Sequence, residues 1–145
     1  TLNDLRKAGI DEQALGAIHA CTDVTGFGLA GHALDMLTDR MQLILHGDRL
    51  PLLPGVAEMA DMGMLPAGNY ANREHAEAYV HNKTPYRSTN TLIQDILFDP
   101  QTSGGLLLAV DRETAETLVE MLRRSFPETA LVGEFTHGER GIQVI

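Results

Sequence analysis

The sequence of 145 residues has little cysteine, few aromatic residues, no tryptophan and few bases. Its single cysteine, Cys21, excludes an internal disulfide framework and fits a reducing compartment, so we expect a cytoplasmic protein. Eleven Lys and Arg against twenty Asp and Glu give a net charge of −9, with no basic cluster. A nucleic-acid partner is therefore not expected. An acidic chain can still bind phosphates if a cation lies between them.

Long apolar runs are lacking too. The longest, Leu106–Val110, is far too short to cross a membrane, and residues 1–10 contain no signal-peptide core. The hydrophobic fraction of 43% is nevertheless normal for a globular domain and excludes disorder as the main state. We expect a single domain over 1–145. Because the chain begins with Thr1, we expect it to be one domain of a larger enzyme.

Hydrophobic spacing and turn residues predict helices that alternate with strands. The class is α+β (mixed α/β), a mixed sheet covered by helices. Residues 65–69 are expected to form a loop, and the last two strands, joined by a turn at 137–141, can pair antiparallel. Asp11 and Asp111 are candidate helix caps. The predicted helices are 11–19, 29–39, 54–63, 74–81, 90–97 and 111–125, and the predicted strands are 20–24, 41–46, 106–110, 130–135 and 142–145.

The first glycine-rich segment, 21–32, reads Cys-Thr-Asp-Val-Thr-Gly-Phe-Gly-Leu-Ala-Gly-His. Gly26, Gly28 and Gly31 have the spacing of dinucleotide-binding turns, and Asp48 follows about twenty residues later. A dinucleotide-binding module is therefore one alternative. Against it, the preceding strand is not continuously apolar, as a strand buried on both faces would be. The carboxylate of Asp23 would also repel a pyrophosphate.

Asp23 favours a different chemistry. With the hydroxyls of Thr22 and Thr25 beside it, it offers hard oxygen ligands at a strand end. Such ligands suit Mg²⁺, which takes one or two carboxylates and completes its shell with water and phosphate oxygens. The helix that begins near Gly28 directs free N–H groups to the same place, where they favour anions. The residues leave a second interpretation open, in which Asp23 or Thr25 only caps that helix.

The second segment, 99–105, reads Asp-Pro-Gln-Thr-Ser-Gly-Gly. It is not a phosphate-binding P-loop, because it lacks the Gly-Lys-Ser/Thr ending and leads into a strand. Taken alone it favours a tight turn, in which Gly104 and Gly105 supply positive φ or close backbone packing.

Together, residues 21–32 and 98–107 resemble the paired signatures of the selenophosphate synthetase (selenide, water dikinase) family. The resemblance covers nearly the whole chain but only the family's C-terminal domain, the type shared with aminoimidazole ribonucleotide synthetase. Related members, such as the purine and hydrogenase-maturation branches, carry a run of glycines at 26–28. Phe27 and the intact 99–105 motif favour the selenium branch, although another ATP-dependent member of the superfamily is an alternative.

The resemblance implies a reaction in which ATP, selenide and water give selenophosphate, AMP and phosphate. The family's reactive Cys or selenocysteine and its essential Lys lie in an N-terminal segment that nothing here matches. The resemblance therefore implies an N-terminal domain of the same chain that holds most of the ATP site and forms a homodimer. We accordingly expect this domain to be inactive by itself.

One metal ligand is implied for this domain, namely Asp23, which would bind Mg²⁺ beside the ATP phosphates. The implied binding residues at the interdomain cleft are Thr22, Thr25, Gly26, Gly28, Thr102, Ser103 and Gly104. In a third interpretation both motifs only pack this domain against its neighbour. Cys21 is expected to be a buried apolar residue and not a nucleophile. Asn72 could shape the cleft, and Arg73 is expected on the solvated surface.

Overall fold

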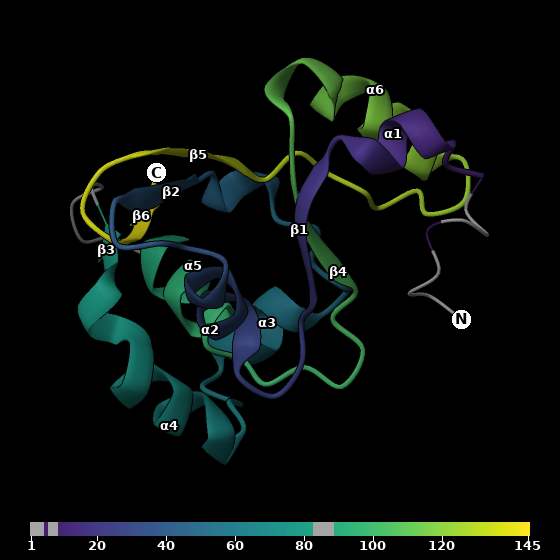
Figure 1. Cartoon of the computed structure of the whole chain (residues 1–145). Helices are drawn as coiled ribbons and strands as arrows, with labels where there is room; N and C mark the ends of the chain where they lie inside the picture. Colours follow the sequence, from purple (N-terminus) through teal and green to yellow (C-terminus); the bar gives the residue numbers. More distant parts are fainter. Residues whose placement is uncertain (1–4, 6–8, 83–88) are drawn as a thin grey trace.

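The computed structural model describes residues 5, 9–82 and 89–145 and places six helices and six strands in them. Among these residues no helix combines the length and the apolar character needed to cross a bilayer. The helices are α1 (Glu12–Gly16), α2 (Gly28–Asp35), α3 (Val56–Asp61), α4 (Ala67–Ala76), α5 (Thr89–Leu97) and α6 (Arg112–Arg123), as Figure 1 shows. The strands are β1 (Ile18–Asp23), β2 (Met41–Leu45), β3 (Val80–Asn82), β4 (Leu106–Val110), β5 (Gly133–His137) and β6 (Gly141–Val144).

Four strands form a mixed sheet in the order β3-β6-β2-β5, which confirms the predicted class. β2 runs parallel to β6 and antiparallel to β5, and β3 runs parallel to β6. The expected pairing of the last two strands is wrong, because β2 lies between them. Their short connection crosses the start of β2, where Gly138 N–H donates to Arg40 O (3.1 Å). There Arg140 also donates to Leu34 O (2.9 Å) in the last turn of α2.

The region 65–82 departs most from the prediction. The expected loop at 65–69 contains the start of α4, and the expected helix at 74–81 ends at Ala76. A short 3₁₀ turn, Glu77–Tyr79, then leads into β3, which no prediction included. β3 has three residues and pairs with β6 through Val80 and Ile142. So short a strand has no period of its own, and its pairing with a distant partner decides its conformation.

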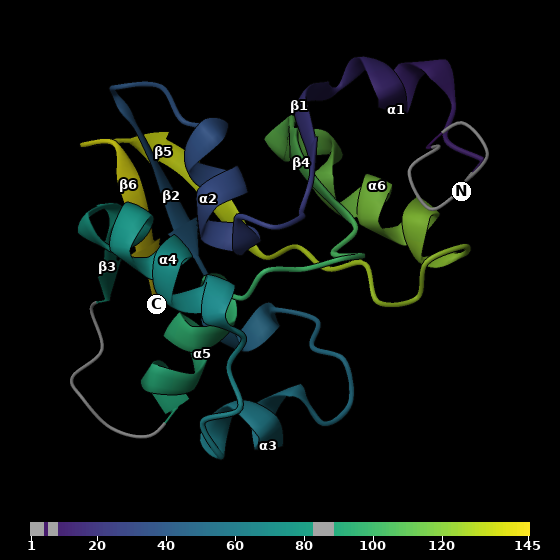
Figure 2. The same cartoon turned by 90° about the horizontal axis from the view of Figure 1, so that it is seen from below.

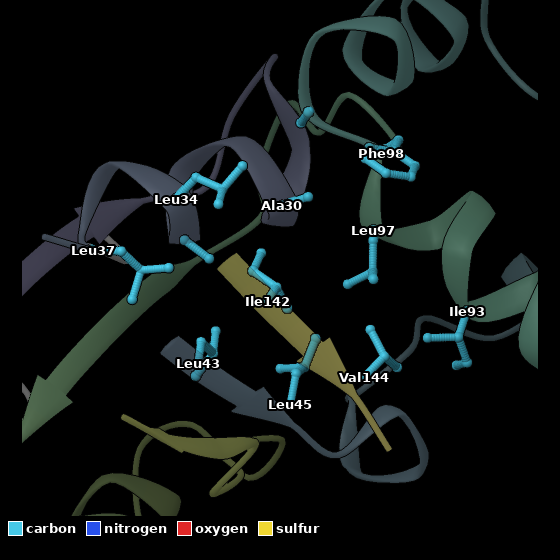
Figure 3. Close-up of a cluster of buried hydrophobic side chains, with 12 residues drawn as sticks. Ala30, Leu34, Leu37, Leu43, Leu45, Ile93, Leu97, Phe98, Ile142 and Val144 are labelled. Carbon is cyan, nitrogen blue, oxygen red and sulfur yellow. The ribbon is translucent and has the colours of Figure 1, made fainter. Parts of the chain in front are cut away.

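The main core lies between the sheet and the helices α2 and α5 (Figure 3). Alternate strand residues point to one face of a sheet, so Leu43 and Leu45 of β2 share a face with Ile142 and Val144 of β6. Helices α2 and α5 cover this face, and α4 packs against α2 (Figure 2). The helices contribute Ala30, Ala33, Leu34, Ile93 and Leu97 to this core, and Leu37 and Phe98 lie just beyond the ends of α2 and α5.

A second, smaller core lies between α1 and α6, which sit side by side away from the four-stranded sheet (Figures 1 and 2). Its buried residues are Ile10, Ala14, Leu118 and Leu122. The antiparallel ribbon of β1 and β4 joins the two cores. Leu107 packs against the main core, whereas Leu108 and Val110 pack against the smaller one.

The two predicted caps have different outcomes. Asp11 does cap α1, since its carboxylate accepts a hydrogen bond from Ala14 N–H (2.7 Å). Asp111 stands at the cap position of α6 but makes no side-chain cap. Its carboxylate instead contacts the ring of His19 on β1, with 2.7 Å between Asp111 Oδ1 and His19 Nε2.

Replacement of Leu45 tests the central position of β2. Its side chain is 1% exposed, so Leu45→Ala should lower the free energy of unfolding by about 2–5 kcal/mol. Leu53 is 75% exposed, and Leu53→Ala should change it by less than about 0.5 kcal/mol. Urea denaturation followed by circular dichroism measures both, and equal losses would contradict this description of the core.

Candidate functional site

The β1–β4 ribbon brings the two glycine-rich segments together. Asp23 at the end of β1 lies opposite Leu106 at the start of β4. The ladder continues beyond both strands, because Val24 N–H donates to Gly105 O (2.9 Å) and Gln101 N–H donates to Thr25 O (3.1 Å). The segments 21–32 and 99–105 therefore lie side by side along their backbones, although residues 33–98 separate them in the sequence.

Two glycines permit this close approach. Gly28 has φ +72°, and a Cβ there would lie 2.8 Å from Leu97 O. A Cβ on Gly104 would lie 2.6 Å from Val24 O, closer than any side chain tolerates. Gly105 has φ +78° with open space around it. The turn prediction for 99–105 therefore describes the local backbone correctly, with Gly104 needed for packing and Gly105 for its positive φ.

A third element, α4, contacts the first segment and the residue just before the second through Asn72. Its side-chain Nδ2 lies 2.8 Å from Gly26 O and 2.9 Å from Phe98 O, and donates to both. The neighbouring Arg73 is not the solvated surface charge that was expected. Its guanidinium pairs with Asp95 (2.5 Å) and lies 5.0 Å from the centre of the Phe98 ring. No sequence motif marks these contacts.

Asp23 is exposed at the strand end, as the sequence predicts. Its two hydroxyl neighbours are partly buried and differ in their contacts. Thr25 Oγ1 lies 3.0 Å from His32 Nε2, so this hydroxyl is already engaged by the helix that follows. Thr22 Oγ1 makes a long contact with Asp23 O (3.4 Å). Asp23 therefore offers an exposed carboxylate at the end of β1.

The interpretation of Asp23 or Thr25 as a helix cap is wrong. The cap residue of α2 is Phe27, whose side chain is 66% exposed and caps nothing. Gly28 N–H donates to the backbone oxygen of Thr25 (3.0 Å). The first turn of α2 thus has no side-chain cap, and its N–H groups remain beside the Asp23 turn.

Two ionisable groups near the site have shifted pKa values. Partial burial, and then the negative charge of Asp23, raise the pKa of the Cys21 thiol. Cys21 is also exposed, so the expectation of a buried cysteine is wrong, yet a raised pKa disfavours the thiolate that a nucleophile needs. Partial burial raises the pKa of Asp99 as well.

The described part of the chain contains no group of three His, Cys, Asp or Glu side chains able to hold a metal ion. Asp23 therefore offers a single carboxylate. Thr102, Ser103 and Gly104 are exposed at the tip of the second turn. A pocket of about 250 Å³ opens beside Phe27, Gly31 and Asn72, and Asp23 does not line it.

The dinucleotide-binding alternative is wrong. That fold needs two neighbouring parallel strands joined by the helix that follows the glycine turn. Here α2 joins β1 to β2, but β1 pairs antiparallel with β4, and β2 belongs to the other sheet. Asp48 lies in a separate 3₁₀ turn, Gly47–Arg49.

Comparison with known families matches residues 2–145 to the model described as "AIR synthase related protein, C-terminal domain". The chain belongs to this family, and the predicted fold is confirmed.

Comparison with individual proteins gives more specific relatives within this family. The chain is 40% identical over 131 residues to the "Selenide, water dikinase" of Treponema denticola, an alignment covering 86% of this chain and 36% of that protein. It is 41% identical over 118 residues to the one from Nitratidesulfovibrio vulgaris (81% and 33%), and 38% identical over 131 residues to the one from Clostridioides difficile (88% and 37%). The resemblance seen in the motifs is thus confirmed. The chain spans about a third of the length of these relatives.

Substitution of Gly28 tests the close approach between the two segments. Gly28→Ala combines an unfavourable φ with a clash against Leu97 O, whereas Gly55→Ala has a comparable φ of +86° and nothing within 4 Å. We expect Gly55→Ala to lower the free energy of unfolding by about 1 kcal/mol, and Gly28→Ala to lower it by at least about 2 kcal/mol more. Equal losses in urea denaturation would contradict the close approach.

Proposed function

We propose that this chain is the C-terminal domain of a selenophosphate synthetase. The complete enzyme converts ATP, selenide and water to selenophosphate, AMP and phosphate. This domain contributes Asp23 and the two glycine-rich turns to the ATP site. An N-terminal domain of the same protein completes that site and forms the homodimer, and the enzyme acts in the cytoplasm.

The observation that carries this proposal is the pairing of β1 with β4. It places Asp23 opposite Leu106, so that both signature segments end at one edge of the fold. The three relatives described above bear the name of this activity, which supports the selenium branch over other ATP-dependent members. A role in domain packing alone would not need an exposed carboxylate at this edge.

The side chains at this site fit a Mg²⁺ ion to which this domain supplies one carboxylate ligand. One exposed carboxylate suits an ion that takes one or two protein carboxylates and fills its shell with water and phosphate oxygens. When bound, Mg²⁺ neutralises the charge that develops on departing phosphoryl groups. Asp23 binds the ion, and the backbone N–H groups at the start of α2 attract phosphate oxygens. In this proposal Thr22, Thr25, Gly26 and Gly28 shape the first turn, and Thr102, Ser103 and Gly104 the second.

Replacement of Asp23 in the complete protein tests the metal role. Asp23→Asn keeps the shape but removes the charge, so the formation of selenophosphate and AMP should fall roughly 100-fold at limiting Mg²⁺. The measurement is ³¹P NMR of reactions with ATP, Mg²⁺ and selenide. Asp48→Asn is the matched control, because Asp48 is an exposed acid outside both motifs. Unchanged turnover in Asp23→Asn would refute the metal role.

A further experiment tests whether the reactive groups lie in another domain. The 145-residue chain alone should consume no ATP in the presence of selenide, because a single carboxylate cannot assemble the reacting groups. The same assay on the complete protein is the control. Selenide-dependent AMP formation by this chain alone would overturn the assignment of the reactive groups to another domain.

A further inference from the structure

Asn72 of α4 makes two hydrogen bonds at the signature turns. A single side-chain nitrogen donates to Gly26 O at 2.8 Å and to Phe98 O at 2.9 Å. Gly26 O lies in the first turn and Phe98 O immediately precedes the second, so one residue from a third segment joins the first turn to the start of the second. The sequence separation is 46 residues in one direction and 26 in the other. A contact of this kind constrains the relative position of the two turns, and not only the shape of each.

Helix α4 holds Asn72 rigidly in place. One residue further along, Arg73 pairs with Asp95 of α5 and lies over the Phe98 ring. One turn earlier, Asn69 is fully buried and donates from Nδ2 to Asp95 O (2.6 Å). α4 is thereby fastened to α5, immediately before the second turn begins. The amide of Asn72 therefore reaches the carbonyls of Gly26 and Phe98 from a fixed support.

The two turns also contact each other directly. Val24 N–H donates to Gly105 O and Gln101 N–H donates to Thr25 O, in continuation of the β1–β4 ladder. These bonds do not involve Gly26, whose carbonyl accepts its hydrogen bond from Asn72. The turn from Asp23 to Gly28 is thus held at Val24 and Thr25 by the second turn, and at Gly26 by Asn72.

We propose that Asn72 is a positioning residue, which holds the Asp23 turn against the 99–105 turn in the arrangement that binds Mg²⁺. The inference rests on the proposed function for its Mg²⁺ readout. Asn72 touches neither the metal nor the substrate in this proposal. Its loss lowers the populated fraction of the binding-competent turn, and the apparent dissociation constant rises in inverse proportion to that fraction. Turnover at saturating Mg²⁺ is retained.

The first test measures hydrogen exchange in the complete protein by mass spectrometry. Asn72→Ala removes the donor from both carbonyls, and alanine preserves the helix. Peptides that cover 24–28 and 99–105 should exchange about tenfold faster, as expected for the loss of two hydrogen bonds. Asn69→Ala is the matched control, because it removes a buried amide from the same helix but contacts neither turn. Because the Arg73–Asp95 pair still joins α4 to α5 in this variant, exchange in these peptides should stay unchanged even though Asn69→Ala lowers thermal stability.

The second test separates positioning from general damage to the fold. In Asn72→Ala, the Mg²⁺ concentration that gives half-maximal selenide-dependent turnover should rise about tenfold, while kcat at saturating Mg²⁺ stays within about twofold. Asn72→Asp keeps the shape of the side chain but offers no donor, and it should also raise the Mg²⁺ concentration for half-maximal turnover. Asn69→Ala should not shift it.

Each outcome decides the inference. Wild-type exchange in both Asn72 variants, or equal acceleration in Asn69→Ala, would overturn the positioning role. A fall in kcat without a change in the Mg²⁺ requirement would overturn it as well. If the wild-type protein consumes no ATP with selenide, the proposed function fails, and the exchange comparison alone decides whether Asn72 joins the turns.

Discussion

The antiparallel pairing of β1 with β4 is the constraint on which the other features of the site depend. It sets Asp23 opposite Leu106 and extends through backbone bonds into both glycine-rich turns. It also connects two separate cores, because neighbouring residues of β4 face different sides. A two-stranded ribbon is only marginally stable by itself. The helices packed on either side therefore stabilise the site, although none of them carries the carboxylate.

Two glycines, Gly28 and Gly104, allow close backbone contacts at the site. The backbone of Gly28 lies against the carbonyl of Leu97, which ends α5, and Gly104 lies against Val24, which follows Asp23. These contacts leave no space for side chains at the glycines. Any ligand must therefore meet the exposed groups around them, which we call the rim. The rim holds one carboxylate and a helix start without a side-chain cap.

The sequence predicts the parts of the fold that local pattern determines. The run Leu106–Val110 is β4, and the strongly periodic segments became α2, α5 and α6 with ends shifted by a few residues. β3 and the insertion of β2 between β5 and β6 escaped prediction, because pairing partners far apart in the sequence decide them. The start of α3 was also misplaced, since Gly55 in a left-handed conformation precedes the helix and Pro54 lies outside it.

The same division applies to the site. The family resemblance identified Asp23 and both turns, and the residues alone left each turn open to a plain structural interpretation. The bonds that unite them are made by backbone groups and by Asn72, and these have no signature that can be read from a single sequence. The engagement of Thr25 by His32 is also a tertiary result, although the two lie within one turn and the helix that follows it.

The sequence distance between β1 and β4 has a consequence for synthesis and folding. Within this domain Asp23 leaves the ribosome early, whereas its partner Leu106 follows only after β2, α4 and α5 have been made. Closing so long a loop costs entropy before any contact compensates for it, and topologies rich in such contacts fold slowly. The carboxylate thus gains its surroundings late, after α2, α4 and α5 can have assembled with β2. The turn that carries Asp23 therefore reaches its final arrangement only when the fold around it is nearly complete.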